Sequence, residues 1–143
     1  LQNVIPATDD VGLELLTSTD GGSTYDTGAS DYTWELEIYG GVKLDAADDA
    51  MNLTGNEAAA GYEVGSAANE PGVSGWIWLI GPHLTGYTMV KWDLGFVADD
   101  GQVVSTPGIG VRLSAANVDA IRILYDSGAL ESGTINAYGL ANA

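Results

Sequence analysis

A two-residue alternation of apolar and polar side chains is the feature that most restricts the fold of this chain. In Tyr32–Tyr39 the apolar positions alternate with Thr33, Glu35 and Glu37. Successive side chains of a strand point to opposite faces, so this pattern predicts a half-buried antiparallel strand with the glutamates on its outward face. Helical periodicity is almost absent from the rest of the chain.

Shorter segments of the same character are expected to form the other strands: Gln2–Ile5, Val11–Thr17, Val73–Ile80, Thr88–Val97, Val103–Ser105, Ile109–Leu113, Ala120–Asp126 and Thr134–Leu140. Glycine-rich and Asp-rich turns separate them, and Asp99–Gln102 has the Asp-Gly signal of a tight hairpin. With 143 residues, the chain has the length of one domain. We predict a single all-β domain over residues 1–143, an antiparallel β-sandwich or jelly roll of about eight short strands.

Three segments leave the prediction less defined. Lys43–Met51 fits either a helical turn or loops with short strands, and Ala58–Ala68 is small, polar and broken by glycine, which predicts a surface loop. Val73–Ile80 is apolar on both faces, with Trp76 and Trp78 on one of them. Such a strand is expected to be central in its sheet or to have one face covered by a neighbouring subunit, which predicts self-association.

The charge of the chain excludes two classes of partner. Twenty acidic residues against four basic ones give a net charge of −16. Nucleic acid and anionic membranes are bound by clusters of Lys and Arg, so neither is an expected partner. The acidic surface is expected to keep the protein in solution. Because the chain begins with Leu1 and has no secretory signal, we expect it to be processed or to lack an upstream anchor segment.

No catalytic or cofactor site is predicted. The chain has no cysteine, and His83, its one histidine, lies in a Gly-Pro-His-Leu loop and is expected to be a surface residue. Glu35 and Glu37 share a face, but that face points outward and not into a cleft where two carboxylates could cleave a glycoside. Neither Lys43 nor Lys91 follows the glycines of a phosphate-binding loop.

Groups of acidic residues and aromatic side chains are the candidate binding sites of the chain. The acidic groups lack known calcium-binding spacing, so no metal site is assigned; they are Asp20 with Asp26, Asp45 with Asp48 and Asp49, and Asp99 with Asp100. The aromatic residues that could stack on a sugar ring are Tyr62, Trp76, Trp78, Tyr87 and Trp92. For Trp76 and Trp78, strand alternation favours a place in the core or a subunit interface over a ligand platform.

The C-terminal part of the chain resembles a known group of proteins. Ile121–Gly128 is followed by Ala129-Leu130-Glu131 and then by Ser132–Leu140, which reads Ser-Gly-Thr-Ile-Asn-Ala-Tyr-Gly-Leu. This succession of a strand, a Ser-Gly turn, Ser-Gly-Thr and a last strand is similar to the end of many tailed-phage virion proteins. Ser18–Tyr25 and Ser30–Trp34 look like the first hairpin of the same group. The filler at Ala129–Glu131 departs from the group's usual sequence, and no shaft or capsid-anchoring segment is present.

The resemblance implies a non-enzymatic jelly roll or sandwich on the virion surface, often a trimer, that decorates the capsid or forms a fibre head. Its implied partners are other copies of the chain and the major capsid protein or fibre and tail components. The alternative is a carbohydrate-binding module whose ligand is a host-surface glycan. We also expect Thr134–Leu140 to pair with Ala120–Asp126 as neighbouring antiparallel strands, with Ile135 turned inward.

Overall fold

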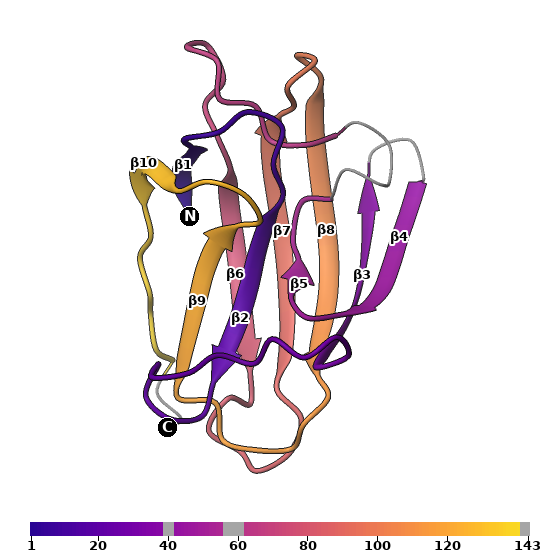
Figure 1. Cartoon of the computed structure of the whole chain (residues 1–143), viewed down its shortest axis with the longest axis vertical. Coiled ribbons are helices and arrows are strands. Elements are labelled where there is room, and N and C mark those ends of the chain that lie inside the picture. The colour runs from indigo at the N-terminus through magenta and orange to yellow at the C-terminus, as the bar shows by residue number, and fades with distance from the viewer. Residues whose placement is uncertain (39–41, 56–61, 141–143) are drawn as a thin grey trace.

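The chain folds into an antiparallel β-sandwich, as predicted. The computed structural model describes residues 1–38, 42–55 and 62–140, and in these residues it contains ten strands and no helix. One sheet has the order β4-β3-β8-β7-β6; these strands are β3 (Tyr32–Ile38), β4 (Val42–Asp48), β6 (Ser74–Ile80), β7 (Met89–Val97) and β8 (Val103–Arg112). The second has the order β5-β2-β9, formed by β2 (Leu13–Ser18), β5 (Met51–Asn52) and β9 (Ala120–Tyr125). These two sheets face each other (Figure 1).

A third, smaller sheet pairs the two ends of the described chain. It consists of β1 (Gln2–Pro6) and β10 (Leu130–Thr134), and it lies at one end of the sandwich (Figure 1). Val4 joins this small sheet to the start of β6 through reciprocal backbone hydrogen bonds with Val73 of 2.9 and 2.8 Å. The hydroxyl of Tyr125 also donates to the carbonyl oxygen of Val4, at 2.7 Å. The N-terminal strand is therefore held to both layers.

The core lies between the two large sheets and follows the alternation of the sequence. In β3, the residues predicted to face inward are buried and Thr33, Glu35 and Glu37 are exposed, as expected. The β7 strand repeats the pattern, with Lys91 and Asp93 on the exposed face. The buried side chains that these strands and β2 contribute are Leu13, Leu15, Tyr32, Trp34, Leu36, Ile38, Val90, Trp92, Leu94 and Phe96. The two-residue alternation of the sequence thus determines which face of each sheet packs against the other sheet.

Strand β8 is one strand where the sequence predicted two. The break was expected near Pro107, but pairing of β8 with β3 ends at Gly108, so Pro107 lies where β8 is paired only with β7. A proline is tolerated where one side of a strand has no ladder to complete. Gly108 is required for another reason: a Cβ there would lie 2.3 Å from Cε2 of the buried Trp92 ring.

The predicted hairpin between β7 and β8 is confirmed. Gly101 has a φ of 85°, a conformation that favours glycine. The backbone N–H of Ala98 donates to the carbonyl of Gln102 at 2.8 Å, and that of Gly101 donates to Ala98 at 2.8 Å. Asp100 accepts hydrogen bonds from both the backbone and side-chain nitrogens of Gln102.

Of the two alternatives for Lys43–Met51, short strands are confirmed and the helical turn is not. The segment contains most of β4 and the start of β5, and β4 pairs with β3 in continuous register. The surface loop expected at Ala58–Ala68 lies partly outside the described residues, as does Tyr39. Within the described part of that segment, Val64 is fully buried and bridges Val11 and Ala98.

The expectation for the end of the chain also needs correction. The last strand, β10, comprises Leu130–Thr134 and pairs with β1, whereas Thr134–Leu140 was expected to pair with the strand that is now β9. The partner of β9 is β2, along its whole length. Residues 135–140 are exposed and not in a strand. The Ser-Gly step that was expected to be a turn is part of this strand: Gly133, with a φ of 132°, lies in β10 where the register with β1 shifts.

Candidate functional site

The outer face of the five-stranded sheet carries the most unusual surface of the molecule. Trp76, Trp78 and Ile80 all point outward from β6 and are 64%, 46% and 48% exposed. β6 is the edge strand of its sheet, so of the two alternatives for this strand the central position is wrong, and cover by a neighbouring subunit stays a prediction. Trp76 and Trp78 were expected in the core or in a subunit interface; the core is wrong, since they form an exposed aromatic pair, and the subunit interface stays a prediction.

The strand register places further side chains beside this pair. Trp78 is opposite Lys91 of β7, and Lys91 is opposite Ile109 of β8, which is itself opposite Glu35 of β3. The next row contains Ile80 and its neighbours Met89 and Val111. A third row contains Trp76 and Asp93. We call the outward-facing side chains of these three rows the outer face; it includes Thr33, Glu35, Asp45, Trp76, Trp78, Ile80, Met89, Lys91, Asp93, Ile109 and Val111.

A shallow hollow of about 250 Å³ lies on the outer face away from the tryptophans. Its lining includes Thr33, Glu35, Asp45, Ile109 and Val111. Glu35 is held at its rim by an exposed ion pair, 3.0 Å long, with the ammonium of Lys43, which raises the pKa of the lysine. The outer face therefore has an aromatic end at the edge strand and a polar end with carboxylates.

The other aromatic candidates do not form a second platform. Trp92 is fully buried in the core and Tyr62 is half-buried, so neither can stack on a ligand. Tyr87 is exposed in the loop between β6 and β7. His83 lies in the same loop and is exposed, as expected for a surface histidine. Glu35 and Glu37 face outward, also as expected.

The carboxylates of Asp20 and Asp26 form hydrogen bonds and an ion pair within the fold. Asp20 accepts hydrogen bonds from Ser18 and from both the backbone and the hydroxyl of Thr24, and these bonds lower its pKa to about 2. Asp26, its expected companion, pairs instead with Arg112 at 2.6 Å.

In each of the remaining two clusters, one carboxylate accepts a hydrogen bond from a nearby backbone N–H. Asp48 accepts a hydrogen bond from the backbone of Asp49, and Asp100 organises the β7–β8 turn. Burial raises the pKa of the neighbouring Asp99. Among the described residues, no three His, Cys, Asp or Glu side chains converge as metal ligands.

Glu14 is a perturbed carboxyl that the sequence reading missed. It lies on β2 opposite Asn52 and Leu124. Burial, together with the charges of Asp126, Asp49 and Asp48, raises its pKa to about 7. A signal was present in the sequence, because Glu14 interrupts the run Leu13–Leu16, where a charged side chain is expected to lose water.

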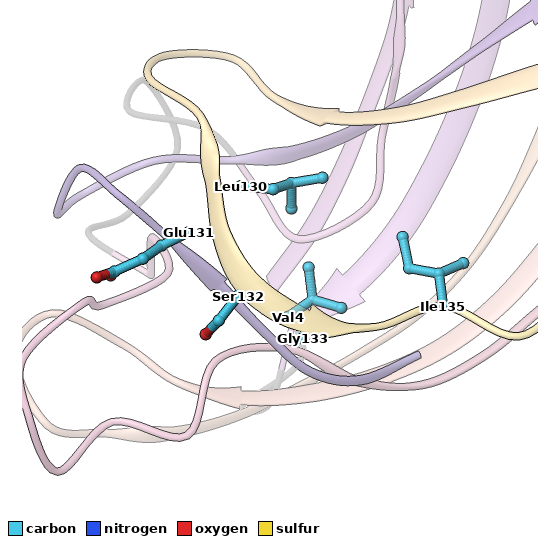
Figure 2. Close-up of a pocket in the computed structure, with 6 residues that line it drawn as sticks. All are labelled: Val4, Leu130, Glu131, Ser132, Gly133 and Ile135. Atoms are coloured by element: carbon cyan, nitrogen blue, oxygen red, sulfur yellow. The ribbon is translucent and has the colours of Figure 1, made fainter.

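The hollow between β1 and β10 offers little chemistry. It has a volume of about 190 Å³ and is lined by Val4, Leu130, Glu131, Ser132, Gly133 and Ile135. Figure 2 shows Leu130, Val4 and Ile135 on one side of β10, with Glu131 and Ser132 turned to the other. The hollow is therefore apolar and has no converging polar groups to fix the orientation of a ligand.

Comparison with known proteins adds no relative: no family model, curated protein or solved structure matches the chain. The described residues also contain no helix that is long and apolar enough to cross a membrane. The fold and the outer face define an antiparallel β-sandwich with one aromatic, uncovered sheet face.

Proposed function

We propose that the chain is a non-enzymatic module on the surface of a phage-like particle and that it makes its contacts through the outer face. The observation that carries this proposal is the exposure of Trp76 and Trp78 on one face of an edge strand. Large apolar patches that stay in water cost free energy, and those that persist usually mark a binding surface. Capsid decoration and the head of a fibre are both contact functions of this kind.

The phage-like end of the chain supports the same proposal. Its two Ser-Gly steps occur where the backbone needs glycine: Gly128 has a φ of 76° in the turn after β9, and Gly133 has a φ of 132° within β10. Added Cβ atoms there would lie 2.2 Å from the Thr8 hydroxyl oxygen and 2.6 Å from the Asn3 carbonyl oxygen. The residues that carry the resemblance therefore shape how the end of the chain packs on β1.

A glycan is the second candidate ligand, favoured by the hollow that lies on the same sheet face as Trp76 and Trp78. Strands lie about 4.8 Å apart, so Trp78 and Glu35, three strands away, are separated by roughly 14 Å along the sheet. Aromatic rings stack on the C–H faces of sugars, and carboxylates accept hydrogen bonds from their hydroxyls. Carboxylates outnumber the lysines on the outer face, and the whole chain has a charge of −16, so the glycan should be neutral.

Immunogold labelling of purified particles with an antibody to this domain tests the location. Gold at the capsid or at fibre tips is expected, and particles without label would refute the proposal.

A neutral-glycan array tests the second candidate, with the purified domain as the probe. The Trp76→Ala and Trp78→Ala variants should lose any signal, while Tyr138→Ala, which removes an exposed aromatic away from the sheet, should keep it. A signal that survives both tryptophan substitutions would place the ligand elsewhere.

A further inference from the structure

Strand β6 has an open edge beyond its first two residues. Leu1 covers the start of the strand: its ammonium donates to the Gly75 carbonyl at 2.9 Å, and the Gly75 N–H donates to the Leu1 carbonyl at 3.2 Å. Backbone groups alternate in direction along a strand, so the N–H and C=O groups of Ile77 and Leu79 point the same way as those of Gly75. β1 lies along that side only where β6 begins, through the Val4–Val73 bridge, and no described strand pairs with that side beyond Gly75.

This edge lacks the features that normally prevent edge-to-edge pairing. The stretch Trp76–Ile80 contains no charged residue and no proline, in a chain whose net charge is −16. The opposite edge of the same sheet, β4, carries Lys43, Asp45 and Asp48. Natural edge strands are usually protected by such charges, by proline or by a bulge, and an unprotected apolar edge is a template for another strand.

We propose that β6 pairs antiparallel with β6 of a second copy of this chain, about a twofold axis that passes through Trp78. In this register, Ile77 exchanges both backbone hydrogen bonds with Leu79 of the second copy, and symmetry repeats the exchange. The strand of the second copy ends at its Gly81-Pro82 turn, opposite Gly75. In each copy, Leu1 already pairs with Gly75 of its own chain, so the edge of β6 is covered along its whole length.

The side chains complement this register. Trp78 faces Trp78 of the second copy as a pair without direct backbone bonds, with the two Cα atoms about 4.5 Å apart. Trp76 faces Ile80 of the second copy on the same side of the joined sheet. Aromatic pairs and aromatic pairs with β-branched residues are favourable across antiparallel strands. The pairing therefore covers part of the exposed apolar surface and satisfies the backbone groups of the edge in one contact.

The negative charge of each copy opposes the contact and makes it dependent on salt. Repulsion between two copies of charge −16 is screened as ionic strength rises, so added NaCl should strengthen the association. This twofold dimer differs from the trimer that the phage resemblance implies. It holds whether the outer face binds a capsid, a glycan or neither.

Disulfide trapping gives a test of the register, because the chain contains no cysteine. Under mild oxidation, Trp78→Cys should form a disulfide-linked dimer, since only residue 78 meets its own copy and the spacing suits a disulfide. Trp76→Cys and Ile80→Cys are the matched controls; each lies four residues, roughly 13 Å, from its own copy and should stay monomeric. Equal cross-linking at all three positions would overturn the register.

Sedimentation velocity on the unmodified chain gives the second readout, at concentrations up to about 0.1 mM, where even a weak dimer is populated. We expect a dimer that Trp78→Lys weakens by about tenfold or more. Ile109→Lys, on the same face but two strands from the edge, should leave it unchanged. A monomer at all concentrations, a trimer, or a dimer that only Ile109→Lys breaks would each refute edge pairing.

Discussion

The ion pair between Arg112 and Asp26 provides the sharpest test of how this fold is held together. The Arg112 guanidinium is almost fully buried and donates to the two carboxylate oxygens of Asp26 at 2.6 and 3.2 Å. Asp26 also accepts from the hydroxyl of Thr17 at 2.9 Å, and its backbone carbonyl accepts from the hydroxyl of Tyr32 at 3.1 Å. The pair therefore joins β2, β3 and β8.

Replacement of Asp26 by alanine leaves the arginine charge buried without its carboxylate. Loss of one partner of a buried pair costs about 3–5 kcal/mol, against a total stability of roughly 5–15 kcal/mol for a domain. The solvent that still reaches Asp26 places the expected loss at the lower end, about 3 kcal/mol. Glu35→Ala removes the acid of the exposed pair with Lys43 and should cost less than about 1 kcal/mol.

Urea denaturation followed by tryptophan fluorescence measures both variants at pH 7. The acid dependence gives an independent check. The hydrogen bond from Arg112 and the bond from Thr17 hold the pKa of Asp26 below its ordinary value. The stabilisation is therefore complete above the ordinary pKa and is lost as pH falls through the lower, folded value. Equal losses for the Asp26 and Glu35 variants at pH 7 would refute the reasoning.

Three further predictions follow from the same structure and are measured by equilibrium unfolding. The raised pKa of Glu14 makes the wild-type protein lose stability as pH rises from about 4.5 to 7. Glu14→Gln should therefore stabilise the protein at pH 8 by about 1–2 kcal/mol, after allowance for the partial exposure of Glu14, and should have no effect below about pH 4. No gain in stability at pH 8 would contradict the burial of this carboxyl. Gly108→Ala should cost about 1–3 kcal/mol because its Cβ collides with Trp92, whereas Gly95→Ala, whose Cβ has only an ordinary contact, should be close to neutral; similar costs would refute the tight packing. Ile135→Ala should lower the free energy of unfolding by less than about 1 kcal/mol, since the side chain is half-exposed. A loss of about 2 kcal/mol or more would show instead that Ile135 is buried, as expected for a C-terminal strand within the sheet.

Local alternation was enough to predict the layers of this sandwich but not its sheet order. The alternation of β3 and β7 could be predicted because charged residues separate the buried positions at the centre of each strand, and the Asp-Gly hairpin has a turn signature of its own. The segment of β4 fits both a helical turn and short strands because its sequence, Val-Lys-Leu-Asp-Ala-Ala-Asp, has weak strand propensity, and its pairing with β3 determines its structure.

The prediction for the end of the chain was wrong for a different reason. Thr134–Leu140 alternates well enough for a strand, but alternation alone gives no information on whether a partner edge is free. The edge of β9 is not used by this segment, and β1 takes up the preceding residues Leu130–Thr134 instead. Pairing over such a distance along the chain depends on tertiary geometry that a local pattern does not contain.

Composition was also misleading for β6, and the reason bears on function. A strand that is apolar on both faces usually lies in the centre of a sheet, where both faces and both edges are covered. In β6, one face is uncovered and, from Trp76 onward, so is one edge. Residues 135–140 are exposed too, yet they form no strand and offer no ordered ladder to a partner. An uncovered face and an uncovered edge therefore occur on the same strand, and one partner surface could cover both. For this reason, we assign the contact surface of the molecule to β6 and its outer face, and not to the end of the chain.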